Sequence, residues 1–402
     1  MPAPQSTTRW FRASVVAAAA STVFMAWWLH WFDLVDLEVY RAGASAFLHG
    51  RDIYQARPRV IPLPFTYPPF AAVAFAPLAV LPDLAARVAM SALSAAALLF
   101  SVVALLRLAA PTMESRRRWA VALAVLAATP LIEPVRDTFR LGQINLVLMA
   151  LVLADLVAIV QGRKGRGILL GLATAVKLTP GVFILYLLVI GRRREALTAA
   201  ASAAAATALA ALLMPSASGR YWGHLVFDDR RIGSAGNVWN QSLRGAVARF
   251  MGAADRGQAV WLVLALVVAC VGLALAARLH AGGEPVLGIG VAAVVGLLVS
   301  PISWNHHWVW ALPLAVGLWQ RAVTVPDRTN WWLAGGWTAT FCLASISWWP
   351  FARQDDYHLT GLNAVSAECY VIVAVVVALV VARVVPGGRK LSGVPTPPRR
   401  SQ

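Results

Sequence analysis

The chain has 402 residues, of which 59% are hydrophobic and only 13% are charged. A soluble domain carries roughly 25% charged residues, so this composition excludes a soluble enzyme and a disordered scaffold and indicates an integral membrane protein. The formal net charge of +17 comes from short basic clusters between apolar segments, which is typical of membrane topology and argues against a nucleic-acid-binding surface. The three cysteines lie inside apolar segments without CxxC spacing and predict neither a disulfide framework nor a zinc site.

Apolar segments of about the length needed to cross a bilayer, about 20 helical residues, recur along the chain. They are residues 11–32, 84–109, 118–132, 144–161, 195–214, 258–280, 285–300, 307–320, 331–349 and 365–385. The first ends in tryptophans and lacks a small-residue cleavage site, so we interpret it as a retained span and not as a signal peptide. The sequence predicts an all-α polytopic membrane protein with about 10 full transmembrane helices, or about 10–13 helices when short or re-entrant segments are included.

Two further apolar segments do not fit a simple crossing. Residues 68–82 contain Pro77 near their centre and predict a re-entrant or strongly broken helix. Residues 167–191 are split by Lys177 and the Pro180–Gly181 pair and are flanked by basic clusters at both ends. This pattern predicts a hairpin of half-helices that enters and leaves the membrane on the same side. Together the two segments could form a groove that opens sideways to the bilayer.

The distribution of basic residues predicts the topology of the chain. With the N-terminus inside, both termini lie in the cytoplasm, and four segments face the outside: 33–67, 133–145, 215–257 and 301–307. We expect a single integral membrane domain over residues 1–385 and a disordered basic cytoplasmic tail over 386–402.

Asp36 follows the first predicted span closely, ahead of an amphipathic stretch over 37–48 that is typical of an interfacial helix. At the membrane boundary its carboxylate could contact a lipid headgroup and a sugar hydroxyl at once. The alternative is that Asp33 and Asp36 are N-caps of this helix. Tyr40 and Tyr67 of the same segment are candidate sugar-binding residues.

Cationic side chains occur in two places that suit an anionic ligand. Arg136 and Arg140 are four residues apart and share one helical face, which suits a phosphate; equally, they form a solvated face paired with acidic neighbours. Lys177 lies deep in an apolar segment, where a charge is costly and indicates function. Its alternative is an ion pair with Asp155 or Glu368.

The outer segments also carry aromatic and amide side chains of the kind that binds carbohydrate, since flat rings cover sugar faces and amides bind hydroxyls. His306 and His307 are adjacent and point in different directions, which makes them a poor metal site but lets one of them bind a phosphate or a carboxylate. The candidate sugar and acceptor ligands outside the first segment are Asn145, Trp239, Asn240, Gln241 and Trp304.

Six motifs occur in order over about residues 33–308: DLEVYRAGASAFLHGRDIY, PFTYPPFAAVAFAPLAVLP, LGQIN, KLTP, NQSL and SPISWNHHW. In this order the sequence resembles the polyprenol-phosphate-mannose-dependent mannosyltransferases of glycosyltransferase family 87. The resemblance implies a GT-C-type fold whose active site faces away from the cytoplasm. It also implies that Asp36 is the catalytic base, with Asp33 as its competitor, and that His306 or His307 lies in the active site.

The resemblance further implies inverting transfer of mannose from polyprenyl-phosphate-mannose to a glycolipid, either a phosphatidylinositol mannoside or a lipomannan precursor, with an α-1,2 linkage at the outer face of the plasma membrane. Arg136, Arg140 and Lys177 are the candidates for binding the donor phosphate. No cofactor is required, because cationic side chains can neutralise the phosphate, although a divalent cation is compatible with the chemistry. We expect a monomer that binds the lipid bilayer and no nucleic acid.

Two other functions are compatible with these features. A transporter or flippase of lipid-linked sugars would also contain broken helices and a central charge, although polar and aromatic side chains concentrated at one face favour chemistry there. An arabinofuranosyltransferase that uses decaprenyl-phosphate-arabinose would share the hydropathy and the aspartate.

Overall fold

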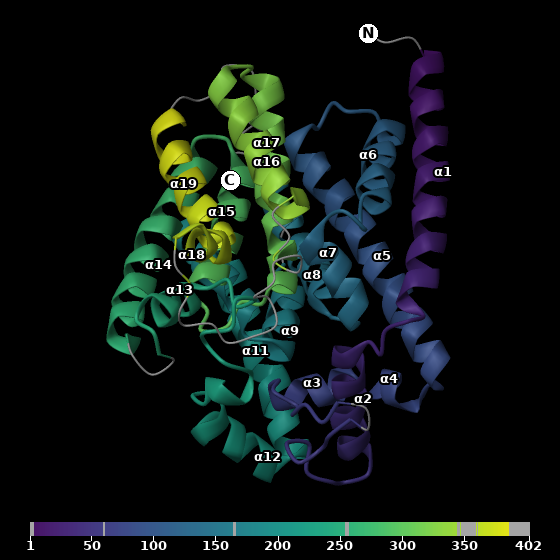
Figure 1. Ribbon diagram of the computed structural model, residues 1–402, viewed down its shortest axis with the longest axis vertical. Coiled ribbons are helices and arrows are strands. Elements are labelled where there is room, and N and C mark those ends of the chain that lie inside the picture. Colours follow the sequence, from purple (N-terminus) through teal and green to yellow (C-terminus); the bar gives the residue numbers. More distant parts are fainter. Residues whose placement is uncertain are drawn as a thin grey trace, which may run out of the picture.

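The computed structural model describes residues 4–58, 61–163, 166–253, 257–343, 346, 359 and 361–385, and every regular element within these ranges is helical (Figure 1). The all-α prediction is therefore confirmed for this part of the chain. The predicted tail over 386–402 lies outside the described residues.

Within the described ranges, four helices are long and apolar enough to cross a membrane: Thr7–Trp28 within α1 (Pro4–Leu29), α5 (Asp83–Ala109), α11 (Arg193–Leu213) and α14 (Gln258–Ala281). Two bent pairs raise this number to six if each pair is one span. The first pair is α7 (Glu133–Leu141) with α8 (Asn145–Val160), bent by 116°, and the second is α18 (Gly361–Ala367) with α19 (Cys369–Val384), bent by 70°.

The membrane character of the chain is thus confirmed, but about 10 full crossings were expected and these helices supply at most six by length and composition. Several predicted spans form shorter helices, namely α6 (Ser115–Ala127), α15 (Pro285–Val299), α16 (Leu312–Thr324) and α17 (Arg328–Leu343). At 1.5 Å per residue, a helix of 15 residues such as α15 is about 22 Å long and falls short of a hydrocarbon core of about 30 Å.

Both segments that were expected to be irregular are broken in the structure. Residues 68–82 form two short helices, α3 (Pro69–Ala74) and α4 (Ala76–Val80), which meet at Phe75. Residues 167–191 form α9 (Ile168–Val176), the 3₁₀ turn η1 (Thr179–Gly181) and α10 (Val182–Val189). Lys177 lies at this break in an extended conformation, with φ −150° and ψ 132°.

Different sets of helices lie at the two ends of the molecule (Figure 1). Helix α1 packs along α6, and the N-terminus and the α5–α6 connection lie at one end (Figure 1). The helix α2 (Val35–Leu48), α3, α4 and α12 (Pro215–Arg220) gather at the opposite end. Segments that were predicted to be outer loops, 33–67 and 215–257, thus contribute to the same end of the fold. The second of them continues through η2 (Tyr221–Leu225), η3 (Asp229–Arg231) and α13 (Leu243–Phe250).

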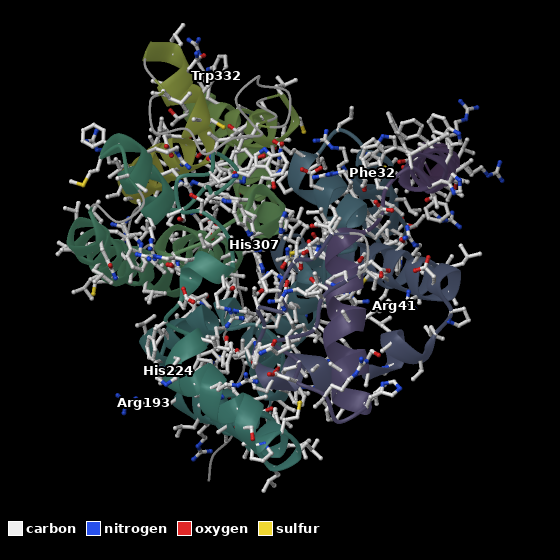
Figure 2. All side chains as sticks on the ribbon, turned by 60° about the horizontal axis from the view of Figure 1, so that its bottom comes forward. Phe32, Arg41, Arg193, His224, His307 and Trp332 are labelled. Carbon is white, nitrogen blue, oxygen red and sulfur yellow. The ribbon has the colours of Figure 1, made fainter. Side chains whose placement is uncertain are left out.

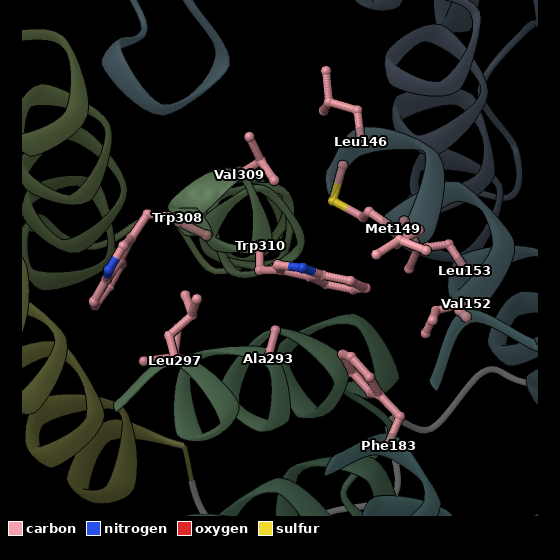
Figure 3. Packing of buried hydrophobic residues seen from close by; sticks show 14 of the residues in the cluster. Leu146, Met149, Val152, Leu153, Phe183, Ala293, Leu297, Trp308, Val309 and Trp310 are labelled. Atoms are coloured by element: carbon pink, nitrogen blue, oxygen red, sulfur yellow. The ribbon is translucent and has the colours of Figure 1, made fainter. Parts of the chain in front are cut away.

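The 3₁₀ helix η4 (Asn305–Ala311) is buried in the hydrophobic core. Figure 3 shows Trp310 of η4 directed between α8 and Phe183, while Trp308 points to the other side of η4, above Leu297 of α15. The rings of Trp310 and Phe183 are 5.2 Å apart, and both tryptophans are buried. Because these two anchors follow His306 and His307 directly, the packing of the core fixes where the histidines lie.

Helix α15 lies against α16 at a contact that only glycine allows. A Cβ atom on Gly290 would be 2.4 Å from the Cα of Leu314, closer than real Cβ atoms come to backbone. Helices in membranes use small residues in this way to let their backbones approach.

We expect Gly290→Ala to destabilise the protein by about 1–3 kcal/mol, the usual cost of overpacking, because backbone would have to move. Gly336→Ala is the matched control, since nothing lies within 4 Å of a Cβ atom there and alanine favours a helix over glycine. Thermal unfolding in detergent compares the two variants. Equal stability of both would show that the α15–α16 contact is not tight.

Candidate active site

A cavity of about 770 Å³ lies at the α9–α10 break and is also lined by residues of α2 and of the loop that follows α12. Its volume falls in the range of small-molecule sites, about 300–1,000 Å³. Seven of the predicted site residues line it: Asp36, Tyr67, Lys177, Trp239, Trp304, His306 and His307. Figure 2 shows His307 near the middle of the molecule, with Arg41, His224 and Trp332 toward its periphery.

The cavity has two chemically different walls. An apolar wall comes from the η1–α10 segment, α14 and α15, and consists of Leu178, Val182, Leu185, Ala269, Leu273, Val295, Gly296 and Val299. The polar and aromatic side chains of the lining come mainly from the loop after α12, which also contributes Leu225, Val226 and Ile232, and we call this part the polar wall. Its polar and aromatic members outside the predicted set are Tyr221, Arg230, Arg231, Ser234 and Asn237.

Asp36 enters the cavity from the first turn of α2. The N-cap of this helix is Leu34, which makes no side-chain capping bond, so the hypothesis that Asp33 and Asp36 serve as N-caps is wrong. Leu34 has φ 45° and ψ 57°, and it is the non-glycine residue with positive φ among the described residues. Such a conformation costs about 1 kcal/mol or more and often marks a functional site. Asp33 is exposed and does not line the cavity.

The surroundings of Asp36 suit a carboxylate that accepts a proton. Burial raises its pKa from 3.8 to about 6, and the charges of Lys177 and Arg140 together with a hydrogen bond from Gln143 oppose that rise. Near neutral pH the carboxylate is therefore mostly ionised, yet more basic than an exposed aspartate.

Lys177 is held by two polar partners at the break between α9 and α10. Its Nζ donates to Oδ1 of Asn145 at 2.9 Å and to Nε2 of His307 at 3.0 Å. The alternative of an ion pair with Asp155 or Glu368 is wrong. Asp155 accepts from the backbone of Leu170, and Glu368 pairs with Arg249 at 2.5 Å.

The two histidines have different surroundings. Nε2 of His307 accepts a hydrogen from Lys177, and its ring also hydrogen-bonds to the backbone of Ile302, so both sides of this ring are engaged. Nε2 of His306 is buried and has no hydrogen-bond partner within the described part of the chain. A buried polar atom without a partner that faces a cavity is positioned to bind a ligand, which distinguishes His306 from its neighbour.

The structure does not bring Arg136 and Arg140 to the cavity wall. Nε of Arg140 is 3.2 Å from Oδ1 of Asp137, and Nε of Arg136 is 3.5 Å from the same atom. Asp137 is almost fully buried and also accepts from Asn305 at 2.6 Å. The arginine pair therefore belongs to a partly buried ion cluster behind η4, and Arg140 acts on Asp36 only through its charge.

Four other predicted ligands are buried outside the cavity lining. Asn240 bonds to Ala235, Pro301 and Ser303, and Gln241 bonds to Val238, Ala367 and Tyr370. These amides hold the loop after α12 against the residues that precede η4 and against α18 and α19. Asn145 bonds to Lys177 and to the backbone of His306, and Tyr40 bonds to Tyr67 and Gln143. These four residues do not line the cavity; they hydrogen-bond to neighbouring residues and hold them in place.

Sequence reasoning missed Gln143 and Arg231 among the residues of the cavity. Gln143 stands within the LGQIN motif, so its motif could have identified it. Arg231 lies within the long loop 215–257, whose aromatic and amide side chains, Tyr221 and Asn237 among them, indicated carbohydrate binding, whereas its arginines gave no such signal. The described residues contain no group of three or more His, Cys, Asp or Glu side chains that could hold a metal ion.

Comparison with known proteins agrees with the order of the motifs. The model of glycosyltransferase family 87 matches residues 65–301. A polyprenol-phosphate-mannose-dependent alpha-(1-2)-phosphatidylinositol mannoside mannosyltransferase of Mycobacterium tuberculosis is 37% identical over 324 residues, which are 76% of this chain and 76% of that protein. A protein of the same description from Mycolicibacterium smegmatis is 37% identical over 351 residues, 81% of this chain and 78% of the relative.

A phosphatidylinositol pentamannoside mannosyltransferase of Mycobacterium tuberculosis, also described as polyprenol-phosphate-mannose-dependent, is 37% identical over 292 residues, 71% of this chain and 66% of that protein. No solved structure is significantly similar to this one. The family model matches more than half of the chain. The relatives are 37% identical to it over more than two thirds of its length. The chain belongs to glycosyltransferase family 87.

Proposed function

We propose that this chain transfers mannose from polyprenyl-phosphate-mannose to a phosphatidylinositol mannoside, forms an α-1,2 linkage with inversion, and uses Asp36 as the general base. The observation that carries the proposal is that one cavity joins a basic carboxylate, the Lys177 ammonium and a long apolar wall. The names of the relatives supply the donor, the acceptor and the linkage.

The apolar wall fits the donor lipid. A polyprenyl chain lying along α10, α14 and α15 would enter the cavity from the bilayer and bring its phosphate to the break where Lys177 lies. The half-helix α10 contributes to this wall as the sequence suggested, whereas α14 and α15 take the part expected of residues 68–82. Lys177 and the unpartnered Nε2 of His306 would bind the phosphate oxygens.

The polar wall fits the acceptor. Trp239 and Trp304 offer flat faces to sugar rings, and Nε1 of Trp239 is buried without a hydrogen-bond partner in the described structure. Such a donor would bind a sugar hydroxyl. The acceptor would thus approach Asp36 from the loop side, opposite the lipid.

The chemistry needs one base and no protonating acid. Asp36 takes the proton of the acceptor hydroxyl while that oxygen attacks C1 of mannose from the face opposite the phosphate. The bond between C1 and the phosphate oxygen breaks, and the phosphate leaves with the electron pair, already an anion of low basicity. Glycosidases need a second carboxyl group because their leaving group is a sugar alkoxide, whereas here Lys177 stabilises the departing phosphate.

The proposed topology places the cavity mouth outside the plasma membrane and both termini in the cytoplasm. The end of the molecule that carries α2 and α12 would be the outer end, and the end with the α5–α6 connection would be the inner one (Figure 1). The cluster Arg116–Arg118 at that connection then faces the cytoplasm, as the positive-inside rule requires.

The proposed reaction can be tested with purified protein in detergent, given radiolabelled mannosyl phosphopolyprenol and a phosphatidylinositol mannoside. We expect a product with one additional mannose that an α-1,2-specific mannosidase removes. Because detergent leaves no sealed compartment, product formation excludes pure transport. Transfer from decaprenyl-phosphate-arabinose in place of the mannose donor would overturn the sugar assignment.

In the same assay, Asp36→Asn should lower the rate of transfer about 10²–10⁴-fold, the usual contribution of a positioned base. The matched control is Asp33→Asn, because Asp33 lies three residues away, is exposed and does not line the cavity. It should retain most of the activity. Loss of activity in the control with full activity in Asp36→Asn would assign the base to Asp33.

Lys177→Met should lower kcat about 10²–10³-fold, as for other lost stabilisers of transition-state charge. It should also weaken inhibition by the product polyprenyl phosphate, because the ammonium would contact the phosphate itself. Arg140→Met serves as the comparison, since Arg140 does not line the cavity. If polyprenyl phosphate inhibits Lys177→Met as strongly as the wild type, the donor phosphate binds elsewhere.

A further inference from the structure

Gln143 lies at the corner between α7 and α8 and has no role in the chemistry described above. Its side chain is buried, lines the same cavity as Asp36 and acts to lower the pKa of that carboxyl group. The function of the amide has to be found in its own geometry.

The hydrogen bonds of Gln143 fix which end of its amide faces Asp36. Oε1 accepts the backbone N–H of Ile144 at 3.1 Å and the hydroxyl of Tyr40. A backbone N–H can only donate, so the atom next to it must be the oxygen. Nε2 is 3.3 Å from the hydroxyl of Tyr67, which also lies 3.4 Å from Oε1. Nε2 is the only part of the amide that can donate to a carboxylate.

Tyr40, whose hydroxyl donates to Oε1 of Gln143, is itself tightly packed. Tyr40 is fully buried, and its ring stacks on Phe75 with centroids 4.2 Å apart. Its hydroxyl also lies 3.0 Å from that of Tyr67. The oxygen of the Gln143 amide is thus held by Tyr40 and Ile144, while its N–H groups are on the side that bonds to Tyr67, within the cavity that Asp36 also lines.

The corner that carries Gln143 sits directly on the first turn of α2 because of Gly142. This residue has φ 67°, and a Cβ atom on it would be 2.8 Å from Cβ of Leu37 and 3.2 Å from Cβ of Leu34. Only glycine suits both the left-handed conformation and the close approach. The two residues that it touches flank Asp36, so the backbone itself brings Gln143 to the base.

We propose that Gln143 is a positioning residue for the general base: its Nε2–H donates to one carboxylate oxygen of Asp36 and thereby turns the other oxygen toward the acceptor hydroxyl in the cavity. This inference rests on the proposed function, in which Asp36 is the base. A carboxylate held by one oxygen presents a single, defined lone pair for proton transfer, whereas a freely rotating carboxylate spends time in unproductive orientations.

The positioning role has a consequence for pH dependence. The charged and titratable groups that act on Asp36 are Lys177 at the α9–α10 break, Arg140 on α7, Tyr40 on α2 and Tyr67 of the following loop. The hydrogen bond from Gln143 stabilises the ionised carboxylate, so its loss raises the pKa of Asp36 above its wild-type value of about 6. Since only the ionised form is a base, kcat/KM should then decline at a higher pH on acidification.

The experiment compares kcat, KM and the pH profile of kcat/KM for wild type, Gln143→Leu and Gln161→Leu. The last is a matched control, because Gln161 is exposed at the other end of α8. We expect kcat of Gln143→Leu to fall about 10-fold, as for a lost hydrogen bond to a charged group, with little change in KM for the donor. The acid limb of its profile should move to higher pH, while Gln161→Leu should match the wild type.

Gln143→Glu is the second variant in case Gln143→Leu does not fold, because a carboxyl group can still accept from Ile144 and Tyr40. A second carboxylate beside Asp36 should move the acid limb to still higher pH. An acid limb at the wild-type position in every variant that folds, together with an inactive Asp36→Asn, would overturn the positioning role and leave the base assignment intact. Full activity of Asp36→Asn would instead overturn the proposed function itself.

Discussion

The ammonium group of Lys177 is enclosed at a break between two half-helices, and its need for polar partners organises the site around it. Asn145 from α8 and His307 from η4 both accept from its Nζ, and its charge also acts on Asp36 from α2. A buried cation without such partners would be strongly destabilising. Elements far apart in the sequence therefore converge on one point, and the cavity forms beside it.

The cavity couples this charge to two different environments, and that combination suits transfer from a lipid-linked sugar. One wall is apolar and comes from membrane helices, while the other is polar and aromatic and comes from loops at one end of the fold. A phosphate at Lys177 would lie where the two walls meet, with its lipid on one side and its sugar directed toward Asp36. In the proposed reaction the leaving group is already anionic, so a single carboxylate and a cation would suffice.

Sequence patterns predicted those features that depend on local chemistry. A lysine near a Pro-Gly pair within an apolar run indicated the break, which the structure has, and the motif order indicated the family, which the comparisons confirmed. That the lysine charge is functional stays a prediction. Spacing could not show partners: Arg136 and Arg140 do share a face, but Asp137 occupies it. Composition could not separate Asn240, which holds the loop together, from Trp239, which lines the cavity. Hydropathy predicted more full crossings than the described helices supply, because it does not show where a helix ends: α6, α15, α16 and α17 have only 13 to 16 residues.

We propose that the donor phosphate binds at Lys177 with its lipid along α10, α14 and α15. A cryo-EM structure of the protein in a lipid nanodisc with bound polyprenyl phosphate would test this placement. We expect phosphate density within hydrogen-bonding distance of Nζ of Lys177 and Nε2 of His306, with the polyprenyl chain leaving between α10 and α14. Phosphate density at Arg136 and Arg140, outside this cavity, would contradict it.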